Sequence, residues 1–169
     1  MTTESAKQAF CDGSNAGEAA EMEGNMGKIS VVYWTQSGNT QMMAEAVAAG
    51  IAEAGREADV IFVSEADAAA LSKDKAFALG CPAMGAEVLE EGEFEPFLEA
   101  LEGSLSGKTV ALFGSYGWGD GQWMRDWTER MAGAGALVIN GEGTICRDMP
   151  DEAALEECRE LGRQLARKA

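Results

Sequence analysis

The chain has 169 residues, of which 46% are apolar and 25% are charged, so it is long enough for one domain with a buried core. Its 29 acidic residues outnumber its 13 basic residues and give a formal charge of -16, which disfavours binding to nucleic acid and to anionic membrane surfaces. Because the chain contains no histidine, a histidine base, a histidine metal ligand and the common serine and cysteine triads are excluded.

The four cysteines, at positions 11, 81, 146 and 158, form no C-x-x-C pair, so the spacing indicates neither a zinc site nor a redox dithiol. Reduced cysteines in a cytoplasmic protein are the expectation. The sequence has no run of 18 apolar residues and no basic leader before an apolar segment, so we expect neither a membrane span nor a secretion signal. Residues 11–27 are small, polar and acidic, and we expect residues 1–27 to form a flexible extension, followed by one domain at residues 28–169.

Strand-like and helix-like patterns alternate from Lys28 to the end of the chain. The run 29-ISVVYW-34 is β-branched and aromatic, and the next segment places Met43, Val47 and Ile51 on one helical face before Gly55. The expected strands are 29–34, 59–63, 76–80, 109–114 and 136–139. Two helices are expected at 39–55 and 94–101, and a third carries Trp123, Trp127 and Met131. The last helix opens at Pro150, Asp151 and Glu152 and ends near Arg163, Arg167 and Lys168.

Strands of nearly continuous apolar character between amphipathic helices are typical of a parallel sheet that is covered on both faces. Five such strands predict a doubly wound α/β fold. Because ligands of these sheets bind at the carboxyl ends of the strands, we expect function in the loops after residues 34, 80 and 114.

The first of these loops, 35-TQSGNT-40, combines hydroxyl groups with a glycine in front of a helix. Unpaired backbone N–H groups and the positive end of the helix dipole would bind a phosphate there without any cation. The same residues are also typical of an ordinary helix cap, so this loop alone leaves both interpretations open. The segment 103-GSLSGKT-109 resembles a nucleotide P-loop, but it has one residue too few between its glycines and precedes a strand, so we interpret it as a turn.

The second and third loops indicate a flat ligand. In 81-CPAMGAEVLEE-91, Met84 supplies a polarisable side chain that packs well on aromatic rings, and the Gly85 peptide can present either its N–H or its C=O, although a plain turn is an alternative. In 112-LFGSYGWGDG-121, Trp118 lies between two glycines with no evident partner in the chain, whereas Tyr116 is the better candidate for folding back on the core. Together the three loops fit a phosphorylated, planar aromatic ligand.

From about Lys28 to its end, the chain resembles the short-chain flavodoxins of anaerobic bacteria. The segments that carry the resemblance are 33-YWTQSGNT-40, 79-LGCPAMGAEVLEEGEFEPF-97 and 112-LFGSYGWGDGQWMRDW-127. The resemblance implies a three-layer fold with a five-stranded parallel sheet of order 2-1-3-4-5. It also implies one non-covalently bound FMN and no metal.

The resemblance further implies a role for individual residues. Residues 35–40 would bind the FMN phosphate with Ser115 close by, and Met84 and Trp118 would lie against the two faces of the ring. The Gly85 peptide would face flavin N5 and tune the redox chemistry, and Glu87 would reach N3. Two residues depart from the family's pattern, Gln36 in the phosphate loop and Ala86 after Gly85. The implied cofactor-binding residues are Thr35, Gln36, Ser37, Gly38, Asn39, Thr40, Pro82, Ala83, Met84, Gly85, Ala86, Glu87, Ser115, Tyr116, Gly117, Trp118 and Gly119.

The function that the resemblance implies is a low-potential one-electron carrier that shuttles between semiquinone and hydroquinone, not an enzyme. We expect a monomer whose partners are basic-surfaced redox proteins, such as reductases, other oxidoreductases and hydrogenase-type enzymes. Residues 87–102 carry seven glutamates and no lysine or arginine, and this acidic run would lower the potential and dock those partners.

An FMN-dependent NAD(P)H:quinone-type reductase on the same fold is the alternative. A phospho-accepting receiver domain would need an aspartate where this chain has Gly80 and Cys81.

Overall fold

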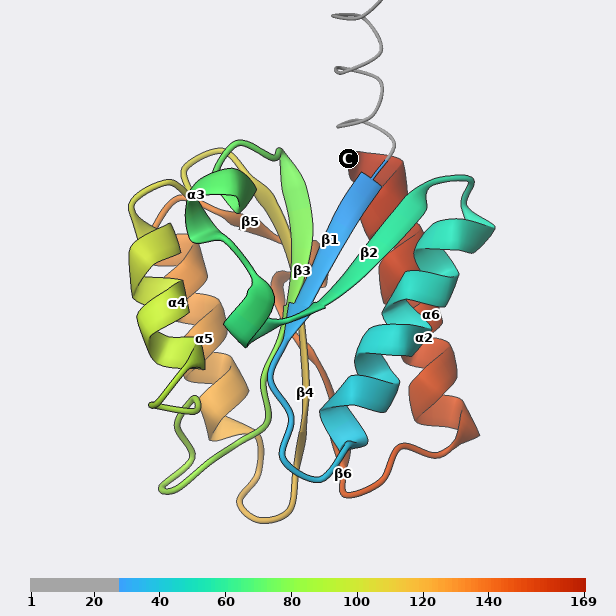
Figure 1. Ribbon diagram of the computed structural model, residues 1–169. Coiled ribbons are helices and arrows are strands. Elements are labelled where there is room, and N and C mark those ends of the chain that lie inside the picture. Colours follow the sequence, from blue (N-terminus) through green and yellow to red (C-terminus); the bar gives the residue numbers. More distant parts are fainter. Residues whose placement is uncertain (1–27) are drawn as a thin grey trace, which may run out of the picture.

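The alternation of apolar strands and amphipathic helices produces a parallel sheet with helices on both faces, as Figure 1 shows for residues 28–169, the part of the chain that the computed structural model describes. The extension expected at residues 1–27 lies outside these described residues. The strand order β2-β1-β3-β4-β5 confirms the predicted doubly wound order. The strands are β1 (Lys28–Tyr33), β2 (Glu57–Phe62), β3 (Ala76–Gly80), β4 (Thr109–Tyr116), β5 (Leu137–Val138) and β6 (Thr144–Arg147).

The fifth position of the sheet is shared by two short strands. β5 pairs with the first two residues of β4, and β6 pairs with β4 from Phe113 to Tyr116, both in parallel. The expectation of one strand at 136–139 is wrong in its length, because a 3-10 turn at Ile139–Gly141, with φ of 63° at Asn140, interrupts it. The sequence does not predict β6, since four residues that are all partly or fully exposed show no clear apolar pattern.

Two groups of helices enclose the sheet (Figure 1). α2 and α6 lie on one face, and α3, α4 and α5 lie on the other. The sequence analysis missed α3, because a single turn of AAAL is too short to show helical periodicity. The helices are α2 (Asn39–Glu53), α3 (Ala68–Leu71), α4 (Phe94–Glu102), α5 (Gln122–Gly133) and α6 (Glu152–Lys168), with 3-10 turns at Val63–Glu65 and Ile139–Gly141.

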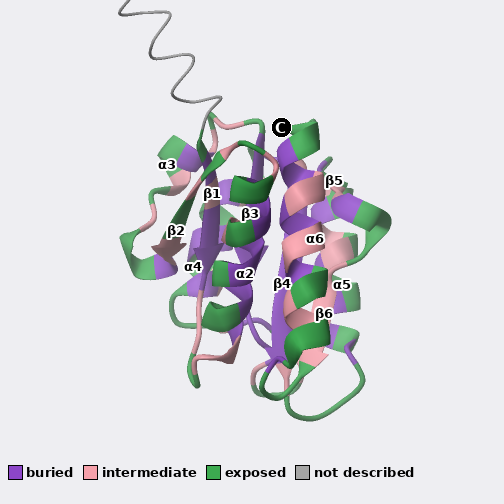
Figure 2. Cartoon of the chain, turned by 90° about the vertical axis from the view of Figure 1, so that its right-hand side faces the viewer, coloured by how far each residue is buried: buried purple, intermediate pink, exposed green. Residues whose placement is uncertain are grey.

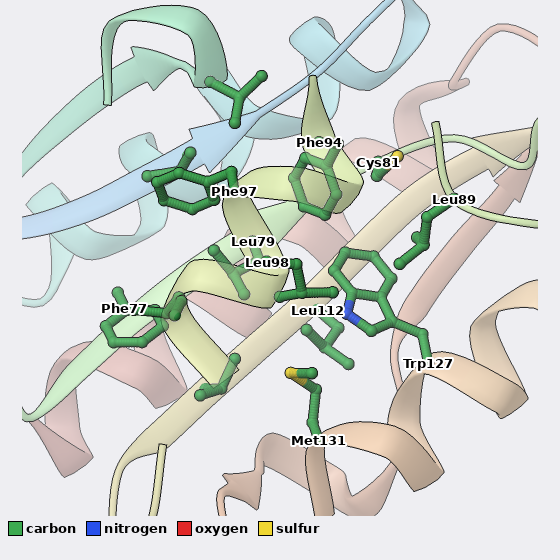
Figure 3. Packing of buried hydrophobic residues seen from close by; sticks show 14 of the residues in the cluster. Phe77, Leu79, Cys81, Leu89, Phe94, Phe97, Leu98, Leu112, Trp127 and Met131 are labelled. Atoms are coloured by element: carbon green, nitrogen blue, oxygen red, sulfur yellow. The ribbon is translucent and has the colours of Figure 1, made fainter. Parts of the chain in front are cut away.

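The central strands are buried on both faces, so the domain has one apolar core on each side of the sheet (Figure 2). The core under α4 and α5 contains the larger side chains (Figure 3). In it the rings of Phe94 and Trp127 meet edge to face with centroids 5.4 Å apart, which joins the two helices. The core under α2 and α6 includes Met43, Val47 and Ile51, as predicted from their helical spacing.

The parallel arrangement brings the carboxyl ends of the strands to one edge of the sheet. The loops after β1, β3, β4 and β6 all leave the sheet at this edge, which is the lower one in Figure 1. A loop on a rigid scaffold of buried strands is held in place at both ends, so this edge is suited to binding a ligand.

Candidate functional site

A cavity of about 300 Å³ opens between the loops at the carboxyl edge of the sheet. The three loops that the sequence singled out all contribute to it, and they are joined by the loop after β6. Its lining consists of Thr35, Gln36, Ser37, Asn39, Thr40, Pro82, Ala83, Met84, Ser115, Tyr116, Gly117, Trp118 and Asp148.

The remaining predicted residues lie beside this cavity and do not line it. They are Gly38, Gly85, Ala86, Glu87 and Gly119. Gly38, at φ 96°, is the residue before α2, and its N–H donates to Thr35 Oγ1 at 3.0 Å, which folds the first loop tightly onto the helix. Gly85 and Ala86 are exposed at the tip of the second loop.

The sequence analysis missed Asp148, which enters the cavity wall from the loop after β6. Its backbone N–H donates to the Tyr116 carbonyl at 2.8 Å, and its φ of 58° turns the chain sharply after the strand. The signal that could have found it is the polar run 147-RDMPD-151 before the last helix. That signal was not interpretable without β6, since a loop can be assigned to the carboxyl edge only when its strand is known.

The first turn of α2 presents uncapped backbone N–H groups to the cavity. No side chain caps this helix, and its first turn contains no acidic residue. The N–H groups of Asn39, Thr40 and Gln41 form no hydrogen bond with any part of residues 28–169. Such a helix end carries a partial positive charge and matches an anion.

Two hydroxyl groups lie beside the N-terminus of α2. Thr40 is 1% exposed and Ser115 is 6% exposed, and their hydroxyl groups share a hydrogen bond. The Ser115 backbone N–H also points at Thr40 Oγ1, at 3.4 Å. The contact fixes the end of β4 against the start of α2 and places Ser115 beside the first loop, whereas the expected proximity of Ser115 to an FMN phosphate stays a prediction.

Met84 and Trp118 enter the cavity wall from the second and third loops. The Trp118 side chain is 49% exposed, whereas Tyr116 packs on Trp123 with ring centroids 5.5 Å apart. This division agrees with the sequence analysis, in which Tyr116 was the aromatic residue expected to fold inward. A large, half-exposed indole beside a cavity is available to a planar ligand.

The second loop ends in a tight turn. Met84 and Val88 exchange two backbone hydrogen bonds of 2.8 Å each, which leaves residues 85–87 as the turn. Gly85 (φ 51°) and Glu87 (φ 57°) both have left-handed backbone conformations. The Glu87 carboxylate accepts a hydrogen bond from the Gln122 backbone N–H at 3.0 Å, across the gap to the third loop.

The acidic run is partly neutralised, which the sequence alone did not reveal. Arg130 on α5 pairs with Glu95 at 2.6 Å and with Glu102 at 2.8 Å. The Glu90 carboxylate accepts hydrogen bonds from backbone N–H groups at the start of α4, and Glu93 accepts one from the Trp34 indole. The expected effect of the acidic run on the potential is therefore weaker for Glu95 and Glu102, whose charges Arg130 partly offsets. Four of the remaining glutamates, which lie between β3 and the start of α4, are called the acidic rim below: Glu87, Glu90, Glu91 and Glu93.

The cysteines of the described residues offer no reactive thiolate. Cys81, Cys146 and Cys158 are free, and burial raises the pKa of each thiol, to about 11 for Cys146 and about 12 for Cys158. Within residues 28–169 no group of three or more Cys, Asp or Glu side chains could hold a metal ion.

The sequence profile of the flavodoxin family matches residues 31–162. The chain is 50% identical over 138 residues to a flavodoxin of Clostridium beijerinckii, which covers 82% of this chain and 99% of that protein. The chain belongs to the flavodoxin family. It is 42% identical to a flavodoxin of Megasphaera elsdenii over 140 residues, covering 82% of this chain and 98% of that protein. A solution structure of two-electron reduced Megasphaera elsdenii flavodoxin superposes with a TM-score of 0.74 at 41% identity, covering 82% of this chain and 98% of that one.

Flavodoxins are FMN-binding electron carriers, and this chain has that function and that cofactor. Nothing in the comparisons favours the quinone reductase alternative. The cavity fits FMN on its own evidence, since it combines an uncapped helix N-terminus for a phosphate with a half-exposed indole for a planar ring. Among the described helices, none is long and apolar enough to cross a membrane.

Proposed function

We propose that the cavity at the carboxyl edge holds FMN non-covalently, with the phosphate at the first turn of α2 and the ring between Met84 and Trp118. Bound there, FMN supplies the one-electron chemistry, and the protein binds it, orients it and sets its potential. The remaining residues of the three loops that the resemblance implicated would complete the site, together with Asp148.

One observation carries this assignment. Every other α-helix in residues 28–169 has a carboxylate that accepts a hydrogen bond from a backbone N–H at or beside its N-terminus. These carboxylates belong to Asp67 for α3, Glu90 for α4, Glu87 for α5 and Asp151 for α6. α2 has none, and its N-terminus borders the cavity. A phosphate would take the place that a carboxylate occupies on the other helices.

Neutral donors suit this phosphate site in a chain of charge -16. The phosphate would be held by the hydroxyl groups of Ser37 and Thr40 and by the backbone N–H groups of residues 39–41, through charge-assisted hydrogen bonds to its oxygens. Because these contacts act at short range, they do not require a positive surface. The site therefore supports phosphate binding without a lysine or arginine in the cavity lining.

Gly85 would tune the redox chemistry through its peptide. The turn at residues 85–87 is pinned at both ends by the Met84 and Val88 hydrogen bonds, while Gly85 is exposed and a side chain there would contact only Val88 at 3.8 Å. This leaves room for the peptide to rotate and to present its carbonyl oxygen to a ligand N–H. Such a hydrogen bond contributes about 1 to 2 kcal/mol.

The acidic rim would make the potential low and dock the partners. Adding an electron next to several carboxylates is unfavourable, since one charge at about 10 Å costs roughly 0.8 kcal/mol at an effective dielectric of about 40. Arg130 offsets one of the two charges of Glu95 and Glu102, so we assign this effect mainly to the carboxylates that it does not pair with, those of the rim among them. An electron carrier needs redox partners, and basic surfaces on those partners complement the rim.

The proposal is tested by ligand binding and by redox titration of the protein. Apoprotein should bind FMN more tightly than riboflavin, because riboflavin lacks the phosphate that α2 would bind; equal affinities would contradict the phosphate site.

A reductive titration followed by visible absorption should show half-reduced protein as a separate species, and less of it in Gly85→Ala. Electron transfer to a basic partner should slow as salt increases, and the protein alone should not turn over NAD(P)H.

A further inference from the structure

Glu87 spans the gap between the two loops that form the walls of the cavity. It belongs to the second loop, whereas the group to which it is hydrogen-bonded, the Gln122 backbone N–H, begins α5 at the end of the third loop. Gly121, the residue before α5, has no side chain that could cap this helix. A residue 35 positions earlier in the sequence therefore supplies the cap.

The third loop is shaped to receive the Glu87 carboxylate. A Cβ atom on Gly119 would lie 2.3 Å from Glu87 Cδ and within 2.5 Å of both carboxylate oxygens, so a side chain at this position would displace the carboxylate. Gly119 also has a φ of 78°, which residues with a side chain rarely adopt. The absence of a side chain at Gly119 therefore makes room for the Glu87 carboxylate, in addition to allowing the turn.

The backbone of Glu87 is held in an unfavourable conformation by these contacts. Its φ of 57° is left-handed, a region that glutamate seldom occupies, and the Met84 and Val88 hydrogen bonds close the turn around it. One carboxylate oxygen, Oε1, bonds Gln122, while Oε2 makes no hydrogen bond within residues 28–169. The free oxygen remains able to accept a hydrogen bond from a ligand.

We propose that Glu87 is a positioning residue that ties the Met84 loop to the Trp118 loop through the Gln122 N–H and so sets the separation of the two cavity walls before the cofactor binds. The inference rests on the proposed function of the cavity but adds a separate requirement, namely a structural role in the apoprotein. Replacing a residue that only touched the bound ring would leave the apoprotein unchanged. Replacing a residue that bridges the loops would loosen them in the apoprotein, and cofactor affinity would fall as a consequence, because the loops would then have to be ordered on binding.

The decisive measurement is amide hydrogen exchange in the apoprotein. Replacing Glu87 by Ala removes the cap, and exchange of the Gln122 amide should accelerate about tenfold, as expected for the loss of a helix cap. Glu87→Gln keeps an oxygen acceptor and should accelerate exchange less. Glu91→Ala is the matched control, since it removes the same charge from the same loop but no hydrogen bond, and it should leave the Gln122 amide unchanged. Equal exchange of that amide in wild type and in Glu87→Ala would overturn the bridge.

A double-mutant cycle with Gly119→Ala separates the bridge from general effects on the loop. Gly119→Ala should also accelerate exchange at Gln122, because the new methyl group displaces the carboxylate. In the Glu87→Ala background the same change should have a smaller effect on exchange, since the contact is already lost and only the strain of the positive φ at residue 119 remains. Additive effects of the two substitutions would contradict the proposal. If wild-type apoprotein failed to bind FMN, the proposed function of the cavity would be contradicted. The exchange results would still show whether Glu87 joins the two loops in the apoprotein.

Discussion

The hydroxyl oxygens of Thr40 and Ser115 lie 3.3 Å apart, although 75 residues separate them in the sequence. This contact joins the first turn of α2 to the end of β4, the two elements that meet at the base of the cavity. Both residues are almost fully buried, so their hydroxyl groups are directed by the fold and not by solvent. Polar groups that are positioned before a ligand arrives bind it with little loss of conformational entropy.

Thr40→Val should weaken FMN binding about tenfold or more, in keeping with the loss of one hydrogen bond to a charged group. Riboflavin binding should change much less, because valine keeps the shape of threonine and riboflavin has no phosphate. Titration of apoprotein with each flavin, followed by fluorescence quenching, gives both affinities. Thr128→Val is the control, since the Thr128 hydroxyl is buried without a hydrogen-bond partner in the described residues and is absent from the cavity lining. Similar losses for the two flavins would contradict a phosphate site at Thr40.

Trp118→Ala should lower FMN affinity while leaving the apoprotein nearly as stable as wild type. The indole is 49% exposed in the protein, so its loss should change the free energy of unfolding by no more than about 0.5 kcal/mol. Stacking on a flavin ring is worth about 1 kcal/mol or more, so affinity should fall about fivefold or more, and Trp118→Phe should retain part of it. Urea unfolding of the apoprotein and FMN titration measure the two quantities. Leu137→Ala, at an exposed residue in β5, should affect neither. A large loss of apoprotein stability in Trp118→Ala would mean that the indole belongs to the core.

The sequence predicted the parts of the fold that depend on local patterns. β3 was predicted with its observed bounds, and the three loops after β1, β3 and β4 do meet at one cavity. The outward position of Trp118 followed from its glycine neighbours and from the lack of any partner nearby in the sequence. The bounds of β3 and the position of Trp118 are encoded by residues that are close in the sequence, whereas the meeting of the loops follows from the rule that the carboxyl ends of parallel strands lie at one edge.

The features that the sequence did not predict depend on residues far apart in the chain. Arg130 meets Glu95 and Glu102 across two helices, at separations of 35 and 28 residues, so the acidic run looked unpaired. Asp148 reaches the cavity through β6, a four-residue strand whose pairing with β4 is visible only in the folded sheet. The Glu87 contact with Gln122 is of the same kind. Spatial pairing of this sort leaves no periodic pattern in a single sequence.

Two buried tryptophans on α5 should respond differently to replacement by phenylalanine. Trp123 and Trp127 are each 1% exposed, but the Trp123 indole donates to the Cys81 carbonyl at 3.1 Å, whereas the Trp127 indole N–H has no partner in the described residues. Trp123→Phe should therefore lower the free energy of unfolding by about 1 to 2 kcal/mol more than Trp127→Phe, since it leaves a buried carbonyl unpaired. Urea unfolding of the two apoproteins under the same conditions compares them directly. Both substitutions remove the same side-chain volume. Equal costs would therefore mean that the hydrogen bond from Trp123 to the Cys81 carbonyl adds nothing to the stability of the domain.

Arg130 should stabilise the domain at neutral pH and lose that effect in acid. Its side chain is 28% exposed and bonds both Glu95 and Glu102, which join α4 to α5. The hydrogen bond from Arg130, with its positive charge, holds the pKa of Glu102 below the usual 4.5 against the opposing effect of burial. A carboxylate whose pKa is lowered by folding contributes stability that is present above its unfolded pKa and is lost as pH falls through its folded pKa.

Arg130→Met should thus lower the free energy of unfolding by about 1 to 2 kcal/mol at pH 7. The difference from wild type should shrink progressively as pH falls below 4.5, because protonated Glu102 no longer attracts the arginine. Arg125→Met is the matched control on the same helix, since Arg125 pairs with Asp120 where the side chains are 53% and 79% exposed, and such pairs contribute little. Urea unfolding of both apoproteins at pH 7 and near the acid limit of folding measures the two differences. A cost for Arg130→Met that is independent of pH would assign its role to packing of the arginine stem, because only the ionic contribution depends on the charge of Glu102.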